Sequence, residues 1–274
     1  MQRAVDTGED SDLGTIFCSA ATEFTQWAPL LWDPMGQALT NFVAPAPGEH
    51  VLDACCGSGS SALPAACAVG VGGTVVGVDL AQGLLDLGRA RAETANLSNI
   101  EFERADVTRW RGGPYDVVQC AYGIFMLPDM DAGGRHLTSL LTPGGRLGVA
   151  VWERGSLEDF GRALYDVVAE HRLVSPATPP GVGAIGRVDQ PDLLRQWLTD
   201  LGLHSTVVRS VPGRVDLDAD RAWSLVLGSG FRQTLNGLSE ADTTTVRGEF
   251  LAALAARGIT SVISTSLLGV GTRP

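Results

Sequence analysis

The stretch Val51-Leu52-Asp53-Ala54-Cys55-Cys56-Gly57-Ser58-Gly59 decides the fold of this 274-residue chain. It is a short apolar strand that ends in a turn with two glycines, and a helix-like segment follows it. Glycines at such a turn let the backbone approach a ligand closely, because no side chain stands in the way. The run from Gly57 to Ala62 also fits the loose GxGxxA form of a dinucleotide-binding turn, which by itself is weak evidence.

Short apolar runs bounded by Gly, Pro, Asp or Asn predict further buried strands along the chain. The helix-like stretches between them are long enough, or nearly so, for the crossovers that parallel strands require. This alternation predicts an α/β fold, a doubly wound and mostly parallel seven-stranded sheet with a helical cap. The expected strands are 50–55, 74–79, 100–104, 115–121, 146–152, 205–211 and 260–270, and the expected crossover helices are 61–69, 81–95 and 134–141.

The remaining segments predict one domain over residues 16–274, preceded by a disordered tail over 1–15. We expect N-terminal helices within 16–43 and an insertion over 153–204 that forms the cap. Within that insertion, the stretch 174–187 is rich in Pro and Gly and can act as a mobile lid.

Composition excludes several classes of function. The 45% of hydrophobic residues can fill a substantial core, and the net charge of −11 opposes binding to nucleic-acid phosphates. All 20 basic residues are Arg. A Schiff-base lysine and a phosphate-loop lysine are therefore excluded.

Cysteine usage and hydropathy indicate where the protein works. The five cysteines form no CxxC pair and have no His at metal-ligand spacing, which suits a reducing compartment. The polar, acidic N-terminus does not resemble a signal peptide, and every apolar run is interrupted before 18 residues. We therefore predict a cytoplasmic protein without a membrane span, and we leave its oligomeric state open.

Three acids follow the predicted strands. Asp79 ends the second strand, where a carboxylate can accept hydrogen bonds from both hydroxyls of a ribose. Asp106 follows the third strand, where it can accept an adenine amine, and Asp53 ends the first strand beside the glycine turn. Any one of them can instead be a helix N-cap or a solvated loop carboxylate. Together they favour a ligand with an amino acid moiety over a pyrophosphate.

These residues resemble the class I S-adenosylmethionine-dependent methyltransferases, in the small-molecule branch similar to ubiquinone and menaquinone biosynthesis methyltransferases. The segment 51–59 looks like the family's first motif, Asp79 like its ribose-binding acid, 105–107 like its adenine-binding turn and 141–147 like the turn into its fifth strand. Trp223, 228–232 and 267–271 look like the C-terminal region of actinobacterial members. One departure is Cys55, which stands where the family usually has Gly.

The resemblance implies bound S-adenosylmethionine and in-line methyl transfer to a small, apolar acceptor, either a natural product or a quinone-like molecule. Phe24, Trp27 and Trp32 can cover the pocket, with cation–π attraction to the sulfonium, and the Tyr122 hydroxyl can orient the acceptor. Each of these aromatic residues can equally be wall or core. The candidate substrate-binding residues are Tyr122, Phe24 and Trp27, and the candidate cofactor-binding residues are Asp53, Cys55, Gly57, Gly59, Asp79, Leu80, Asp106, Val107 and Cys120.

We name no catalytic base, because none of His50, His136, His171 and His204 is convincingly placed. We predict no metal, although Asp129 and Asp131 follow the fourth strand. Three alternatives stay open. The chain can be a cyclase or pericyclase that keeps S-adenosylmethionine bound, a nicotinamide-dependent oxidoreductase, or a cofactor-binding partner subunit without catalysis.

Overall fold

The computed structural model describes residues 21–171 and 182–274. The expectations for the tail over 1–15 and for most of the stretch 174–187 lie outside these residues. In the described part, no helix is long and apolar enough to cross a membrane.

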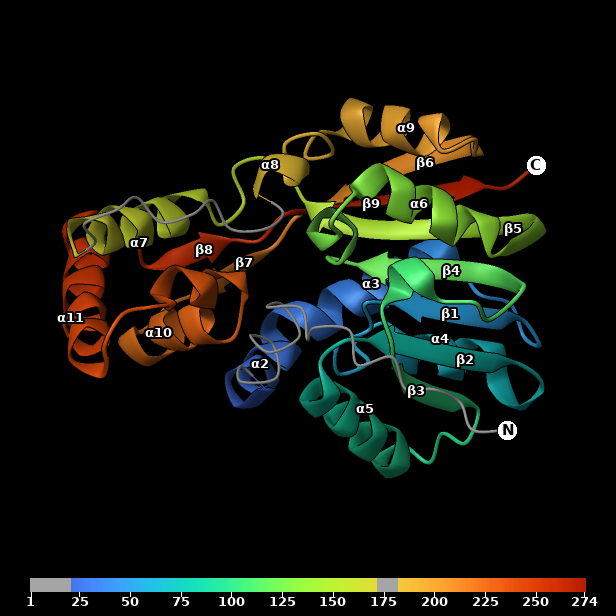
Figure 1. Cartoon of the computed structure of the whole chain (residues 1–274), viewed down its shortest axis with the longest axis horizontal. Helices are drawn as coiled ribbons and strands as arrows, with labels where there is room; N and C mark the ends of the chain where they lie inside the picture. Colours follow the sequence, from blue (N-terminus) through green and yellow to red (C-terminus); the bar gives the residue numbers. More distant parts are fainter. Residues whose placement is uncertain (1–20, 172–181) are drawn as a thin grey trace.

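A seven-stranded sheet forms the centre of the molecule (Figure 1), with the strand order β3-β2-β1-β4-β5-β9-β6. Strands β1 to β5 pair in parallel, whereas β9 is antiparallel to both of its neighbours. The predicted doubly wound α/β fold is therefore confirmed. The strands are β1 (His50–Ala54), β2 (Thr74–Asp79), β3 (Ile100–Arg104), β4 (Tyr115–Ala121), β5 (Leu141–Trp152), β6 (His204–Val211) and β9 (Ser266–Thr272).

Helices cover both faces of this sheet because the strands are apolar on both sides. On one face α3 (Asp33–Val43), α4 (Ala62–Val69) and α5 (Gln82–Thr94) pack over a buried core. On the other face α6 (Met130–Ser139) and α9 (Pro191–Asp200) contribute Leu137 and Trp197 to a second core. The strand order reverses between β1 and β4, and ligands of such sheets bind at that point, outside the carboxyl ends of the strands.

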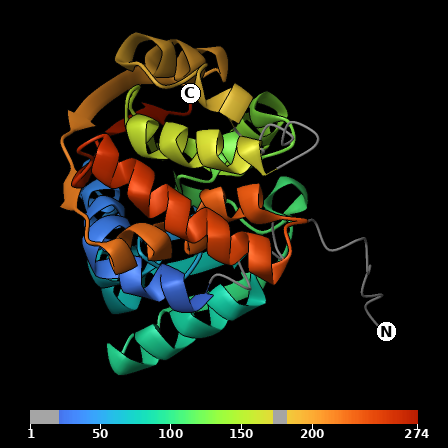
Figure 2. The same ribbon diagram turned by 90° about the vertical axis from the view of Figure 1, so that its left-hand side faces the viewer.

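A third core belongs to a helical subdomain next to those strand ends. It consists of α7 (Glu158–Glu170), α10 (Ala219–Leu227), α11 (Glu240–Ala256) and a small sheet of β7 (Arg214–Asp216) and β8 (Ser261–Ile263). Helix α2 (Ala21–Trp27) packs on α10 and adds Trp27 to this core. In Figure 2 the subdomain faces the viewer, with α7 and α11 side by side.

Two expectations about the second half of the chain need correction. The single strand expected over 260–270 is two strands, because the chain crosses from the small sheet to the large one at Ser264 and Thr265, which bond to Gly213 and Glu153 respectively. The segment 153–204, expected to form the cap, divides between α7 in the subdomain and α9 on the large sheet, and residues 214–263 supply the rest of the subdomain. The apolar pattern of a helix predicts that one face is buried, but it does not show against which part of the protein that face packs.

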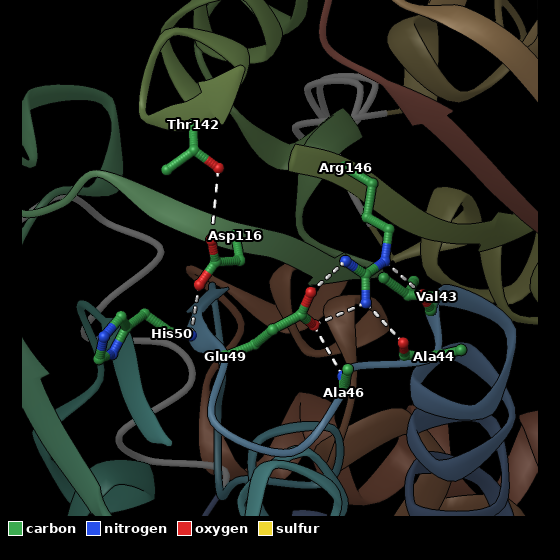
Figure 3. Close-up of polar contacts among 8 residues, drawn as sticks. All are labelled: Val43, Ala44, Ala46, Glu49, His50, Asp116, Thr142 and Arg146. Carbon is green, nitrogen blue, oxygen red and sulfur yellow. Dashed lines mark hydrogen bonds and ion pairs between the residues drawn. The ribbon is translucent and has the colours of Figure 1, made fainter. Parts of the chain in front are cut away.

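Arg146 holds the amino-terminal edge of the sheet together (Figure 3). Its guanidinium donates to the Val43 carbonyl at 2.7 Å and to both Glu49 carboxylate oxygens at 2.9 and 2.8 Å. It also donates to the Ala44 carbonyl, so it satisfies the last carbonyl groups of α3. These contacts fasten α3 to β5 at the edge opposite the ligand crevice.

We expect Glu49→Gln to lower the free energy of unfolding at pH 7 by about 1.5 to 3 kcal/mol, the usual range for charge-assisted hydrogen bonds. The bond from Arg146 is the largest cause that lowers the pKa of Glu49, so the ionised form is favoured in the folded state. Its contribution is complete above the ordinary Glu pKa of about 4.3 and is lost as the pH falls through the lower folded-state value. Urea denaturation from pH 7 to pH 3 measures this.

The matched control is Glu103→Gln, which changes an exposed glutamate on β3. We expect its free energy of unfolding to match that of the wild type at every pH from 7 to 3. A Glu49→Gln deficit that persists unchanged at pH 3 would contradict the assignment.

Candidate functional site

A cavity of about 750 Å³ lies at the carboxyl ends of β1, β2, β4 and β5. Its floor is the sheet edge with the glycine turn, and its other walls come from α7, from the 3₁₀ turn η5 (Gly230–Leu235) and from the segment after β5. This volume is within the range of small-molecule and cofactor sites, about 300 to 1,000 Å³. The predicted ligand edge is therefore hollow.

The glycine turn uses left-handed backbone at three alternate positions. Cys55, Gly57 and Gly59 have φ angles of 57°, 52° and 84°. A side chain in this conformation costs roughly 1–2 kcal/mol, which explains why the related family has Gly where this chain has Cys55. Gly123 accommodates the cysteine, since a Cβ at Gly123 would lie only 2.4 Å from Cys55 Cβ. Cys55 and Gly57 both line the cavity.

Asp79, at the end of β2, contributes its carboxylate to the cavity floor. Its Oδ2 accepts the Gly57 N–H and its Oδ1 accepts the Ala81 N–H, each at 2.9 Å. Burial raises the pKa of Asp79, and these backbone hydrogen bonds oppose the increase. Each carboxylate oxygen retains a lone pair, so the group can accept two further hydrogen bonds from adjacent hydroxyls.

Asp106 lines the cavity and also caps a 3₁₀ turn. Its Oδ1 accepts hydrogen bonds from the Thr108 N–H at 2.9 Å and the Thr108 hydroxyl at 2.7 Å. Its Oδ2 lies 3.8 Å from Arg109 Nε, outside hydrogen-bonding distance. Oδ1 therefore serves as the cap, and Oδ2 remains able to accept a hydrogen bond from a ligand. Leu80 and Val107, which directly follow the two acids in the sequence, add apolar surface to the cavity wall.

Three predicted cofactor-binding residues lie behind the wall instead of in it. Asp53 is fully buried, and the single Ser61 hydroxyl donates to its carboxylate, with Oγ 3.0 and 2.8 Å from the two carboxylate oxygens. Burial raises the pKa of Asp53 to about 7, against the effect of the Ser61 hydrogen bond. Gly59 packs on Phe102, and Cys120 is fully buried. Their backbone and packing shape the turn, and the structure gives none of them a place in the cavity lining.

An aromatic cluster forms the wall beside the end of β4. Tyr122 stacks on Trp152 at 4.3 Å between ring centroids, and Trp32 meets Tyr122 edge-on at 5.7 Å. Phe24 stacks on Trp32 at 5.2 Å and lies within 4 Å of the position that a Cβ of Gly57 would take. The Tyr122 hydroxyl is already bonded to Ser266 Oγ at 2.6 Å. Because its hydroxyl is engaged in this way, the prediction that Tyr122 orients an acceptor now rests on its ring.

Trp27 is a correction to the predicted substrate-binding set. Its side chain is 1% exposed, packs in the core of the subdomain and donates from Nε1 to Ser224 Oγ at 2.9 Å. Trp32 lines the cavity in its place. The sequence places both tryptophans in N-terminal helices, but which side faces the cavity depends on how α2 packs against α10.

The sequence prediction missed the wall that follows β5 and the wall from the subdomain. Trp152 could have been found, because it ends a strand at the ligand edge. Arg154 and Asp189 form an ion pair at the rim, with distances of 2.9 and 3.0 Å, and Tyr165 and Phe231 come from the subdomain. No sequence signal connects these last residues to the glycine turn, since only tertiary packing brings them together.

None of the four histidines lines the cavity in the described structure. His171 bonds to Glu249 at 2.5 Å, and His50 and His204 bond to neighbouring hydroxyls. Asp129 caps α6 and Asp131 pairs with Arg187 at 2.9 Å.

Asp33 links the N-terminal helices to the glycine turn. Its Oδ1 accepts hydrogen bonds from Ser60 Oγ at 2.6 Å and from Arg91 Nη2 at 2.9 Å. Arg91 in turn donates to the Ser58 carbonyl at 3.1 Å. Because Asp33 directly follows Trp32, this network fixes the aromatic wall relative to the turn.

We expect Asp33→Asn to weaken binding of S-adenosylhomocysteine about five- to tenfold, since it removes one charge-assisted contact that orders the turn. Calorimetric titration measures the effect. The control is Asp86→Asn, which changes an exposed acid paired with Arg89 on α5. Equal affinities for the two variants would show that the network does not support the binding site.

The fold and the site define a class of protein. A doubly wound sheet with a glycine turn, a strand-end acid and a hollow at the switch point is the architecture of nucleoside-binding α/β domains. Residues 51–145 match the family model described as "Methyltransferase domain". The segment from β1 into β5 is thus similar to the class I S-adenosylmethionine-dependent methyltransferases.

Two relatives illustrate this similarity. Nocamycin O-methyltransferase of Saccharothrix syringae is 32% identical over 163 residues, which are 56% of this chain and 57% of that protein. The 2-phytyl-1,4-naphtoquinone methyltransferase of Synechococcus elongatus is 34% identical over 122 residues, 43% of this chain and 51% of that protein. The chain therefore spans about half the length of these relatives.

Among solved structures, the [4+2]-cyclase SpnF matches with a TM-score of 0.52 at 17% identity, over 88% of this chain and 80% of that chain. This likeness shows the fold. It agrees with the sheet described above.

Proposed function

We propose that this protein is an enzyme that transfers a methyl group from S-adenosylmethionine to a small, largely apolar acceptor, a natural product or a quinone-like molecule. The observation that carries the proposal is one continuous cavity that joins Asp79 and the glycine turn to a wall of aromatic rings. The first part suits a nucleoside and the second suits an apolar ring system.

The residues present fit the cofactor. Asp79 has lone pairs that can accept hydrogen bonds from two ribose hydroxyls, and Asp106 Oδ2 can accept a hydrogen bond from an amine. Leu80 and Val107 offer apolar surface for a flat base. When bound, S-adenosylmethionine supplies an activated methyl group on a sulfonium centre.

The chain's own part in the reaction is positioning. Trp32, Tyr122 and Trp152 present packed rings that can hold a planar acceptor and exclude water from the cavity. Holding two reactants in a near-attack arrangement can contribute on the order of 7 to 11 kcal/mol toward lowering a barrier. The Tyr122 phenol stays protonated, because burial raises its pKa, so we assign it no role in accepting a proton.

The names of the relatives support the acceptor class. One is named for nocamycin and the other for a naphthoquinone, and an aromatic cavity wall suits a flat ring system such as a naphthoquinone. The fold shared with a [4+2]-cyclase keeps a cyclase with retained cofactor as the second candidate.

The deciding experiment is calorimetric titration with S-adenosylmethionine and S-adenosylhomocysteine, followed by incubation with methyl-labelled cofactor and a panel of phenolic and quinol acceptors. We expect binding in the micromolar range and label in an extractable product. No binding at millimolar ligand would contradict the proposal. Binding together with ring closure of a polyene and no label in the product would favour the cyclase.

A further inference from the structure

Tyr165 is a cavity residue whose hydroxyl group has no hydrogen-bond partner among the described residues. It lies on α7, in the wall that the subdomain supplies, and it is partly buried. Its ring meets Phe231 edge-on at 6.1 Å between centroids. Within residues 21–171 and 182–274 no hydrogen bond to its hydroxyl occurs.

The other side-chain hydroxyls of the described cavity wall all form hydrogen bonds within the protein. Tyr122 bonds to Ser266 at 2.6 Å, and Ser61 bonds to Asp53 at 2.8 Å. Two further hydroxyls donate to backbone carbonyls, those of Ser156 at 2.7 Å and Ser229 at 2.6 Å. Tyr165 is therefore the hydroxyl that a ligand in this part of the cavity can use.

The position of the Tyr165 ring is set by its neighbours. Gly161 lies one turn earlier on α7, and a Cβ there would come within 3.0 Å of the Phe231 ring and 3.6 Å of the Tyr165 ring. The absence of this side chain lets the two rings pack together, and Phe231 is held in turn by Phe160 at 5.4 Å. A hydroxyl on a ring fixed in this way loses little conformational entropy when it binds a ligand.

The environment also sets what this hydroxyl can do. Burial raises the pKa of Tyr165, so the phenol remains protonated at neutral pH and can donate a hydrogen bond. A ligand oxygen that lies beside this phenol in the cavity can therefore accept its hydrogen bond.

We propose that Tyr165 is a specificity residue that donates a hydrogen bond to an oxygen of the acceptor, and that the acceptor is a planar ring system carrying a carbonyl or ionised hydroxyl oxygen. The planar body follows from Trp32, Trp152 and Phe231, whose rings line the same cavity. The inference rests on the proposed function only in naming the bound molecule as the acceptor.

The test uses two flat tricyclic probes that differ in one group, xanthone with a carbonyl and xanthene with a methylene. Each is titrated into the full chain with and without saturating S-adenosylhomocysteine, and quenching of tryptophan fluorescence gives the affinity. We expect the wild type to bind xanthone about five- to tenfold more tightly, as one hydrogen bond provides. We expect Tyr165→Phe to bind both probes within about twofold of each other.

The matched control is Tyr115→Phe, since the Tyr115 hydroxyl accepts a hydrogen bond from Trp110 at 3.0 Å at the opposite edge of the sheet. It should keep the wild-type preference. The proposal is overturned by a preference that survives in Tyr165→Phe, by equal binding of both probes to the wild type, or by no binding of either. Failure of S-adenosylhomocysteine to bind is a separate result, which counts against the proposed function and leaves the probe comparison intact.

Discussion

Replacing Asp79 by alanine is expected to weaken the binding of S-adenosylmethionine by more than about 100-fold. The variant loses the carboxylate that faces the cavity, and two charge-assisted hydrogen bonds contribute on the order of 3 to 6 kcal/mol together. It also leaves the Gly57 and Ala81 N–H groups without their acceptor, so the glycine turn loses a fixed point. Calorimetric titration against the wild type measures the loss.

Asp79→Asn separates the two effects. The amide keeps one oxygen that can accept a backbone hydrogen bond but removes the charge, so its affinity should lie between those of the wild type and Asp79→Ala. Asp86→Ala, at an exposed acid on α5, is the matched control and should bind normally. Wild-type affinity in Asp79→Ala would exclude this carboxylate from the cofactor site.

Replacing Trp27 by alanine is expected to lower the free energy of unfolding by about 3 to 5 kcal/mol, the range for removal of a buried large aromatic side chain. Trp27 is among the largest fully buried side chains and connects α2 to the core of the subdomain. Because it does not line the cavity, the folded fraction should bind S-adenosylhomocysteine with nearly wild-type affinity. Urea denaturation and titration at low temperature test the two statements.

Trp27→Phe and Phe24→Ala are the comparison variants. Trp27→Phe removes the hydrogen bond to Ser224 and part of the buried ring, so its cost should lie between zero and that of Trp27→Ala. Phe24→Ala removes a ring that lies over the glycine turn, so it should reduce ligand affinity more than stability. A Trp27→Ala protein that is stable but does not bind ligand would restore the original prediction that Trp27 is a binding residue.

The sequence by itself determined the central sheet and its ligand edge. Periodic apolar runs and crossover lengths predict β1 to β5 in order, and parallel strands place their carboxyl ends at one edge. For that reason Asp79 and Asp106 could be brought together with Gly57 before any coordinates were known. Both acids do line one cavity with the turn.

Only the tertiary structure decided which side chains of these segments face the ligand. Asp53 and Asp79 both lie at strand ends. The carboxylate of Asp53 is buried against the Ser61 hydroxyl, whereas the carboxylate of Asp79 lines the cavity. Trp27 and Trp32 differ in the same way, because the packing of α2 on α10 buries one and exposes the other. The acceptor wall with Tyr165 comes from a subdomain distant in sequence, and local patterns carry no information on contacts that form only when separate segments pack together.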